Sequence, residues 1–325
     1  MNVKNLAEMQ IPVEEVENID ELVRDGYYGC RSDAIHDIIR RGRKELGKLK
    51  MSTEVVVTLI GMGTLALFAF GFFFGALYTL FTGKVGFNFD FTSGTILISV
   101  ALFIGTVVLH ELIHGVFMSI YGGKPLYGAG IAYILPYFYA TTKTVFLRNQ
   151  FIVIAIAPLV VISLVGIGLM TAFPSIAHWI FIPFVLNASG AVGDLWVTRN
   201  VLRYPKHVLL EDRKTWLIIY GKETDKNMNI STTGFGSRFF KVFILCFFAV
   251  GILMGIAPIA LDILGVESFT IGPTNSLYTI FEFHSPEKGF DFTLHLLPIL
   301  AISVIAGLVY AIIKTGKPRN HAMKG

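Results

Sequence analysis

Charged residues are scarce in this sequence of 325 residues: they make up 15% of the chain, whereas soluble domains carry about 25%. Hydrophobic residues make up 54%, and the mean hydropathy is +0.64. This balance excludes an ordinary soluble protein and a disordered one. Only two cysteines are present, which excludes a disulfide framework. The first ten residues are polar and predict no cleaved signal peptide.

Long apolar stretches begin after residue 50 and predict a polytopic α-helical membrane protein with about six transmembrane helices. The six predicted spans are residues 55–81, 95–120, 149–173, 176–198, 239–264 and 292–313. Each is long enough to cross about 30 Å of hydrocarbon. With the N-terminus inside, all of the 27 Lys and Arg residues except Lys84 and Lys288 lie on the inner side. This asymmetry predicts cytoplasmic N- and C-termini. No internal repeat is evident, which argues against a transporter built from inverted repeats.

The second span contains the sequence His110-Glu111-Leu112-Ile113-His114, an H-E-x-x-H motif. Residues four apart lie on one face of a helix, so both imidazoles can bind one zinc ion. Glu111 lies beside them and can take a proton from the attacking water. The alternative is a buried polar cluster that only packs the helices together.

A hydrolytic zinc site needs a third protein ligand. No histidine follows the motif closely, and no other glutamate lies within a span. Asp194 in the fourth span is the predicted ligand, because the second and fourth spans run in the same direction and place His110 and Asp194 at similar depth. Asn187 lies two turns before Asp194 on the same helical face and is predicted to hold substrate backbone or to orient a ligand. For Asn187 and Ser189, hydrogen bonding between helices is the open alternative.

These residues resemble the three-helix core of site-2 proteases, and in particular their zincin-peptidase relatives. The resemblance covers about residues 95–200 and is carried by three stretches: HELIHG (110–115), FIVIAIAPLVV (151–161) and NASGAVGDLW (187–196). The proline of the family's Asn-x-x-Pro pattern is absent, and Gly193 precedes Asp194 instead of following it. The resemblance implies a zinc-dependent intramembrane endopeptidase with one Zn²⁺ per chain and a membrane protein as substrate.

Residues 122–147, between the second and third spans, are rich in Gly and Tyr and predict a hairpin. An unpaired strand there could hold an extended substrate by β-addition. The open alternative is a packing loop that plugs the cytoplasmic mouth of the site. A second, small cytoplasmic hairpin is predicted at residues 207–221, and residues 265–291 are expected to form an acidic outer loop.

Residues 1–50 are predicted to form a separate cytoplasmic module. The apolar pattern predicts a strand at residues 7–11 and helices after Pro12 and Ser32. This order resembles ribbon-helix-helix regulators, which implies a homodimer and permits DNA binding. Glu8 would repel phosphate, however, and the basic residues 40–50 can instead face anionic lipid.

We therefore expect a membrane metalloprotease domain over residues 51–325 in a prokaryotic cytoplasmic membrane. In this interpretation His110, His114 and Asp194 bind zinc and Glu111 is the catalytic base. The alternative is a membrane-tethered regulator that senses a metal or ligand without protease activity. The intact Glu111 favours the enzyme, since a sensing site needs no general base.

Overall fold

The computed structural model describes residues 24–25, 43–84, 92–132, 135–213, 216–227, 234–273, 276, 278–285 and 291–316. The strand and helices predicted between residues 7 and 39 therefore lie outside the described residues, apart from residues 24–25. The chain divides into two compact units. The first comprises Met1–Met51 and Gly63–Ile230, and the second comprises Ser52–Met62 and Ser231–Gly325.

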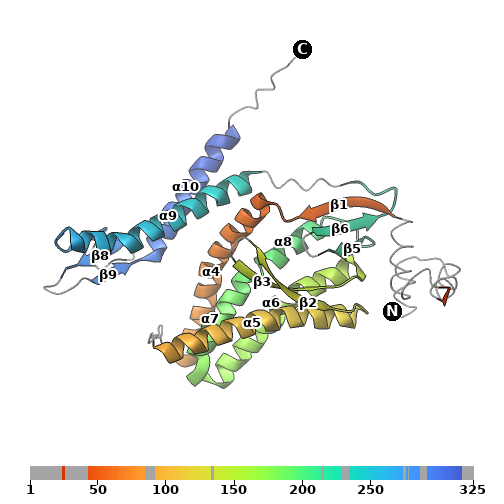
Figure 1. Cartoon of the computed structure of the whole chain (residues 1–325), viewed down its shortest axis with the longest axis horizontal. Coiled ribbons are helices and arrows are strands. Elements are labelled where there is room, and N and C mark those ends of the chain that lie inside the picture. Colours follow the sequence, from red (N-terminus) through yellow and green to blue (C-terminus); the bar gives the residue numbers. More distant parts are fainter. Residues whose placement is uncertain are drawn as a thin grey trace, which may run out of the picture. The chain divides into compact units, whose positions relative to one another are not determined.

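Six helices of the described residues are long and apolar enough to cross a membrane, which confirms the predicted number of spans (Figure 1). They are α4 (Thr53–Thr82), α5 (Ser93–Ile120), α6 (Arg148–Ala172), the segment Pro174–Val201, α9 (Phe235–Ile263) and α10 (Leu296–Gly316). The segment Pro174–Val201 is broken into a short 3-10 turn η1 (Pro174–Ile176), α7 (Ala177–Gly190) and α8 (Val192–Val201). The break between α7 and α8 is surrounded by the small residues Ser189, Gly190 and Gly193. Kinks in helices commonly occur at Gly and Ser, so these residues account for the position of the break.

In the first unit, α5, α6 and α7 pack against one another in pairs. Ile113 of α5 is buried together with Ala157 and Ile162 of α6. Gly166 of α6 allows the close approach of α7, since a Cβ at this position would lie 2.7 Å from the ring of Phe184. This packing fixes α5 against α6 and against α7, the helix that carries Asn187.

An antiparallel sheet of the same unit joins segments that are far apart in the sequence. Its strands are β1 (Lys44–Lys50), β6 (Trp216–Gly221), β5 (Leu209–Asp212) and β4 (Val145–Leu147), in this spatial order. The pairing of β5 with β6 confirms the hairpin predicted at residues 207–221. Residues 44–50, which belong to the predicted N-terminal module, form the edge strand β1 and pair with β6.

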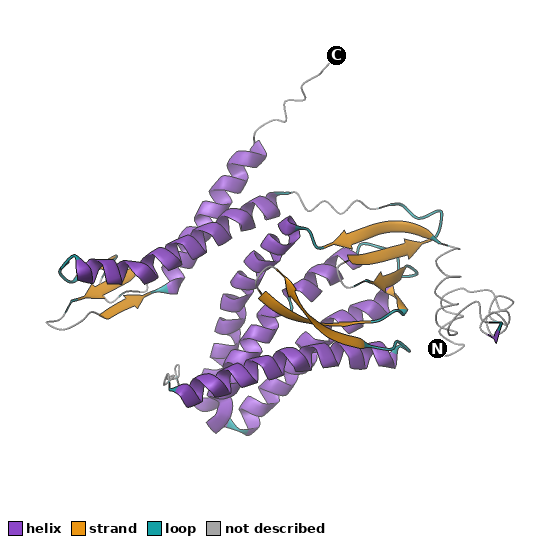
Figure 2. Ribbon diagram, in the orientation of Figure 1, coloured by secondary structure: helices purple, strands orange, loops and turns teal. Residues whose placement is uncertain are grey.

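The hairpin predicted at residues 122–147 is also confirmed (Figure 2). Strand β2 (Leu126–Ala132) pairs antiparallel with β3 (Leu135–Thr141), and both strands contact α5. Tyr139 stands opposite Gly128, and the hydroxyl end of its side chain lies over this glycine. An aromatic ring over a cross-strand glycine covers the backbone that glycine leaves open.

The second unit contains α9, α10 and an antiparallel sheet of β7 (Phe269–Ile271), β8 (Phe281–His284) and β9 (Asp291–Leu294). The sequence predicts a loop at residues 265–291 and a last span that begins at residue 292. In the structure β9 pairs with β8 and α10 begins at Leu296. The span therefore starts later than predicted, because Asp291–Leu294 gives its backbone hydrogen bonds to the sheet.

Candidate metal centre

Helix α5 carries two histidines one turn apart, and their rings lie side by side. The ring centroids of His110 and His114 are 4.9 Å apart with an angle of 76° between the ring planes. His114 is buried against α6. The i, i+4 spacing on a helix accounts for this arrangement.

A main-chain carbonyl and a side-chain amide orient the two imidazoles. Nδ1 of His114 lies 2.9 Å from the carbonyl oxygen of Ile154 on α6, and Nδ1 of His110 lies 2.8 Å from Oδ1 of Asn187 on α7. Each oxygen can only accept, so each Nδ1 carries the proton that it donates. In the neutral rings the Nε2 atoms are then left with lone pairs, the tautomer that a metal-binding histidine requires.

Asp194 completes the cluster from the first turn of α8. Its Oδ2 lies 3.2 Å from Nε2 of His110, and its Oδ1 lies 3.7 Å from Nε2 of His114. One ligand atom from each of the three residues can be chosen so that all lie within 4.8 Å of one another. The break before α8 turns this carboxylate toward α5.

The donor set of these three residues fits a divalent cation such as zinc. When both rings are neutral and donate their Nδ1 protons elsewhere, two nitrogen lone pairs and a carboxylate face one another with no hydrogen between them. Such a group of acceptors is stabilised by a positive charge at its centre. Two imidazoles and one carboxylate are also the ligand set of many catalytic zinc sites, which keep a fourth position open.

Glu111 lies next to this cluster but outside it. Its Oε2 accepts a 2.7 Å hydrogen bond from the main-chain N–H of Ala140 on β3. This hydrogen bond joins the predicted catalytic base to the β2–β3 hairpin, and it leaves Oε1 free of this contact.

Asn187 contacts His110 through its Oδ1, the contact that an orienting role would use. Its side chain is buried, and within the described part of the chain its Nδ2 has no hydrogen-bond partner. Ser189 donates instead to the carbonyl oxygen of Leu186 in its own helix. The hydrogen bond between helices that was left open for both residues is therefore formed by Asn187.

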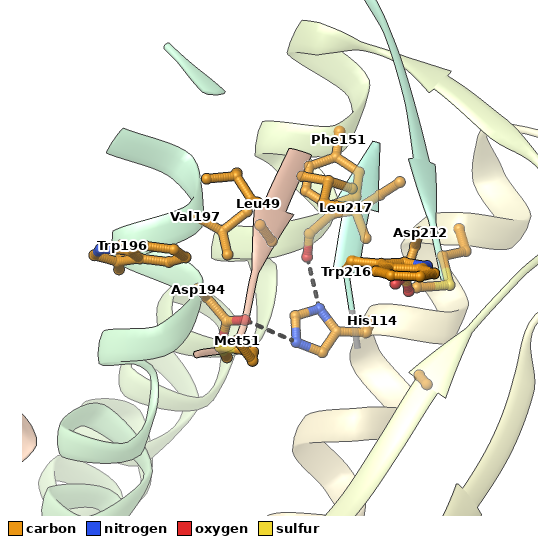
Figure 3. A pocket seen from close by; sticks show the side chains of 14 residues that line it. Leu49, Met51, His114, Phe151, Asp194, Trp196, Val197, Asp212, Trp216 and Leu217 are labelled. Carbon is orange, nitrogen blue, oxygen red and sulfur yellow. Dashed lines mark hydrogen bonds and ion pairs between the residues drawn. The ribbon is translucent and has the colours of Figure 1, made fainter. Parts of the chain in front are cut away.

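A cavity of about 210 Å³ adjoins His114 and Asp194 (Figure 3). Besides residues of α5, α6 and α8, its wall includes Leu49, Met51, Trp216 and Leu217. Sequence reasoning missed these four residues, because they lie far from the motif and carry no signal of their own. Only the pairing of β1 with β6 brings them to the site.

The sheet end of this unit carries an ion pair outside the spans. Nε2 of His207 lies 2.8 Å from Oδ2 of Asp225, and this hydrogen bond lowers the pKa of the Asp225 carboxyl. The main-chain N–H of Lys222 donates to the same oxygen. Arg43 donates to the carbonyl oxygen of His207, and burial lowers the pKa of its guanidinium. These contacts tie the start of β1 to the turn that follows β6.

Comparison with known proteins gives one finding that bears on this site. No curated protein and no solved structure matches the chain. Residues 103–209 match the model of a protein family described as "Putative zincin peptidase", and this stretch contains His110, Glu111, His114, Asn187 and Asp194.

Proposed function

We propose that this protein is a zinc-dependent intramembrane endopeptidase that cuts peptide bonds of membrane proteins. One observation carries the proposal: Nε2 of His110, Nε2 of His114 and the carboxylate of Asp194 converge beside Glu111. All four residues belong to helices that are long and apolar enough to span a membrane. The match of residues 103–209 to a zincin-peptidase family supports peptidase chemistry.

In the proposed hydrolysis, three residues bind the zinc and Glu111 transfers the proton. Zinc bound by His110, His114 and Asp194 would polarise the scissile carbonyl and make water more acidic. Oε1 of Glu111 accepts the proton of the attacking water and then delivers it to the leaving amine. The hydrogen bond from Ala140 to Oε2 holds the carboxylate of Glu111 in place during both transfers.

Within the described residues β3 pairs with β2 alone, and its other edge supplies a place for the substrate backbone. The N–H of Ala140 points to Glu111 and therefore away from β2. Hydrogen-bonding direction alternates along a strand, so the main-chain groups of Phe138 face the same open side. A helical substrate hides its peptide bonds, and pairing with this edge would hold it extended next to the ligands.

The setting of the enzyme follows from the charge distribution. We place the N- and C-termini in the cytoplasm of a prokaryotic cell, with residues 51–325 as the protease domain and residues 95–200 as a site-2-protease-like core. Residues 1–50 would be a ribbon-helix-helix-like attachment that forms a homodimer or recruits a partner. DNA binding by this attachment is the less favoured role, because Glu8 is acidic.

Metal content of the detergent-purified full chain tests the proposal, with wild type measured beside His110→Ala. We expect about one zinc per chain in the wild type and its loss in the variant. His178→Ala is the matched control, since His178 lies in α7, and it should retain the zinc. A folded wild type that takes up no supplied zinc would favour the membrane-tethered regulator instead.

A further inference from the structure

The cavity beside the metal centre is lined mostly by apolar side chains. Its polar lining residues are His114 and Asp194, which face each other, and Asp212 at the end of β5, which lies beside Trp216 (Figure 3). Most of the remaining surface is aliphatic or aromatic and comes from α6, α8, β1 and β6. A group in this cavity would touch the ligands on one side and apolar side chains on the others.

Part of this wall lies outside the segment that matches the peptidase family. The matched segment ends at residue 209, whereas Met51 precedes α4 and Trp216 begins β6. Trp216 is paired with Lys50 across the sheet, so the two rim residues Met51 and Trp216 are held near each other by the backbone. The cavity is thus completed by segments that flank the matched segment on both sides.

Its size fits one large side chain. A closed apolar cavity of about 150 Å³ is enough to bind benzene, and this cavity measures about 210 Å³. The ring of Phe or the branched end of Leu therefore fits, whereas a small side chain would leave most of the apolar wall uncovered. A charged side chain would lose its hydration against this wall.

The position of Ala140 links the cavity to the strand edge. Ala140 lines the cavity and donates its N–H to Glu111. A substrate strand along β3 has side chains that alternate between two faces. A substrate side chain on the face toward the cavity enters it when the adjacent scissile carbonyl of the substrate lies beside His110, His114 and Asp194.

We propose that this cavity takes one large apolar side chain of the substrate next to the bond that is cut, and that Met51 and Trp216 determine the preference for it. The assignment rests on the proposed peptidase function. It adds a specificity determinant contributed by the two flanking segments of the chain.

Hydroxamates separate the cavity from the metal centre, because their headgroup binds zinc whatever side chain they carry. We would titrate zinc-loaded, detergent-purified full chain by calorimetry with acetohydroxamate, 3-phenylpropionohydroxamate and glutaric acid monohydroxamate. Burial of the phenyl group predicts binding about tenfold to a hundredfold tighter than that of acetohydroxamate. The carboxylate of the glutaric compound should gain no such advantage.

Two sets of variants assign this preference to the cavity. In Met51→Ala/Trp216→Ala the preference for the phenyl compound should fall several-fold, with acetohydroxamate binding unchanged. Both residues are partly exposed, at 47% and 39%, so their loss should not unfold the chain. Lys50→Ala, an exposed neighbour outside the cavity, is the matched control. Ala155→Leu, which fills the cavity from α6, should also abolish the preference.

The outcomes of these titrations test the cavity assignment separately from the proposed peptidase function. Acetohydroxamate binding without preference for the phenyl compound, or a preference untouched in the double variant, would overturn the cavity assignment and leave the metal centre standing. Binding of no hydroxamate to zinc-supplied protein would overturn the metal centre and the cavity assignment together. If Ala155→Leu fails to fold, the rim variants alone decide the question.

Discussion

The main-chain N–H of Ala140 donates a 2.7 Å hydrogen bond to Oε2 of Glu111. This contact joins the middle of α5 to the β2–β3 hairpin, two elements that the sequence separates by 29 residues at this point. It fixes one carboxylate oxygen of Glu111 and leaves the other for a proton. The contact therefore holds Glu111, the proposed base, at a fixed position relative to the edge of β3.

Glu111→Gln should abolish peptide cleavage and leave zinc binding intact. The amide keeps the size of the side chain and can still accept from Ala140, but it cannot take a proton from water. General acid–base groups contribute about 10²- to 10⁴-fold to rates, so cleavage of a membrane-protein substrate should fall by at least that range. Metal analysis of the same preparation provides the control. Retained proteolysis would sink the assignment of Glu111 as the base.

Asp194→Ala should lower the zinc content of the purified chain. The substitution removes the only carboxylate among the three residues that the structure brings together at this cluster. Mass spectrometry of metal content under limiting zinc measures the effect. Asp262→Ala, an exposed carboxylate on α9, is the control and should bind zinc as wild type does. Equal zinc in the Asp194 variant would mean that the third ligand lies elsewhere.

Asn187→Ala should weaken zinc binding by about 10- to 100-fold, the usual cost of removing a residue that orients a metal ligand. Without Oδ1 of Asn187, Nδ1 of His110 loses the acceptor that holds its tautomer. Competition with a chelator measures the affinity. Asn200→Ala is the matched control, because that amide donates to Trp196 within its own helix. Asn187→Asp keeps an acceptor and should restore most of the affinity, whereas Asn187→Leu keeps the size of the side chain without an acceptor and should not. A purely packing role would not produce this difference.

Much of this site could be predicted from the sequence because its signals are local. The H-E-x-x-H spacing needs only one helix, and the depth argument that paired Asp194 with His110 needs only two spans that run in the same direction. The alternating Gly and Tyr residues of the β2–β3 hairpin are likewise a short-range pattern. In each case the prediction depends on one or two segments and not on how distant segments pack.

Strand β1 could not be predicted, and its backbone explains why. Leu46 and Leu49 are both buried although they lie three positions apart, a spacing that does not fit the two-residue repeat of a strand. The register with β6 shifts between Glu45 and Gly47, and this irregularity turns both leucines to the same side. The cavity wall that depends on β1 was hidden for the same reason.

Stability at acid pH should depend on Asp225. The hydrogen bond from His207 lowers the pKa of this carboxyl below its ordinary value of 3.8. A carboxyl with a lowered folded-state pKa stabilises the fold above its ordinary pKa and loses that contribution as the pH falls through the lowered value. Asp225→Asn should therefore lower the unfolding temperature at pH 7, and its difference from wild type should shrink as the pH falls through the lowered pKa of Asp225. Glu223→Gln in the same turn is the control; an equal effect of both substitutions at pH 7 would contradict the role of the ion pair.

The packing of the β2–β3 hairpin against α5 allows a test of whether β3 positions Glu111. A Cβ on Gly115 would overlap the hydroxyl and ring of Tyr127, which stands opposite Ala140 in the hairpin. Gly115→Ala should push β2 and β3 away from the helix and reduce cleavage by up to about 10²-fold with zinc content unchanged, since small misplacements of reacting groups have effects of that size. The substitution itself favours the helix by about 1 kcal/mol, so a loss of helix stability cannot account for such a result.

Gly105→Ala is the matched control in the same helix, because a Cβ there meets nothing within 4 Å. It shares the gain in helix propensity and should cleave as wild type does. Tyr127→Ala in the Gly115→Ala background removes the overlap and should restore cleavage. Rescue would show that Gly115 acts through the hairpin, because a defect within α5 would persist in the double variant. Unchanged cleavage by Gly115→Ala would mean that the place of β3 on α5 does not limit catalysis.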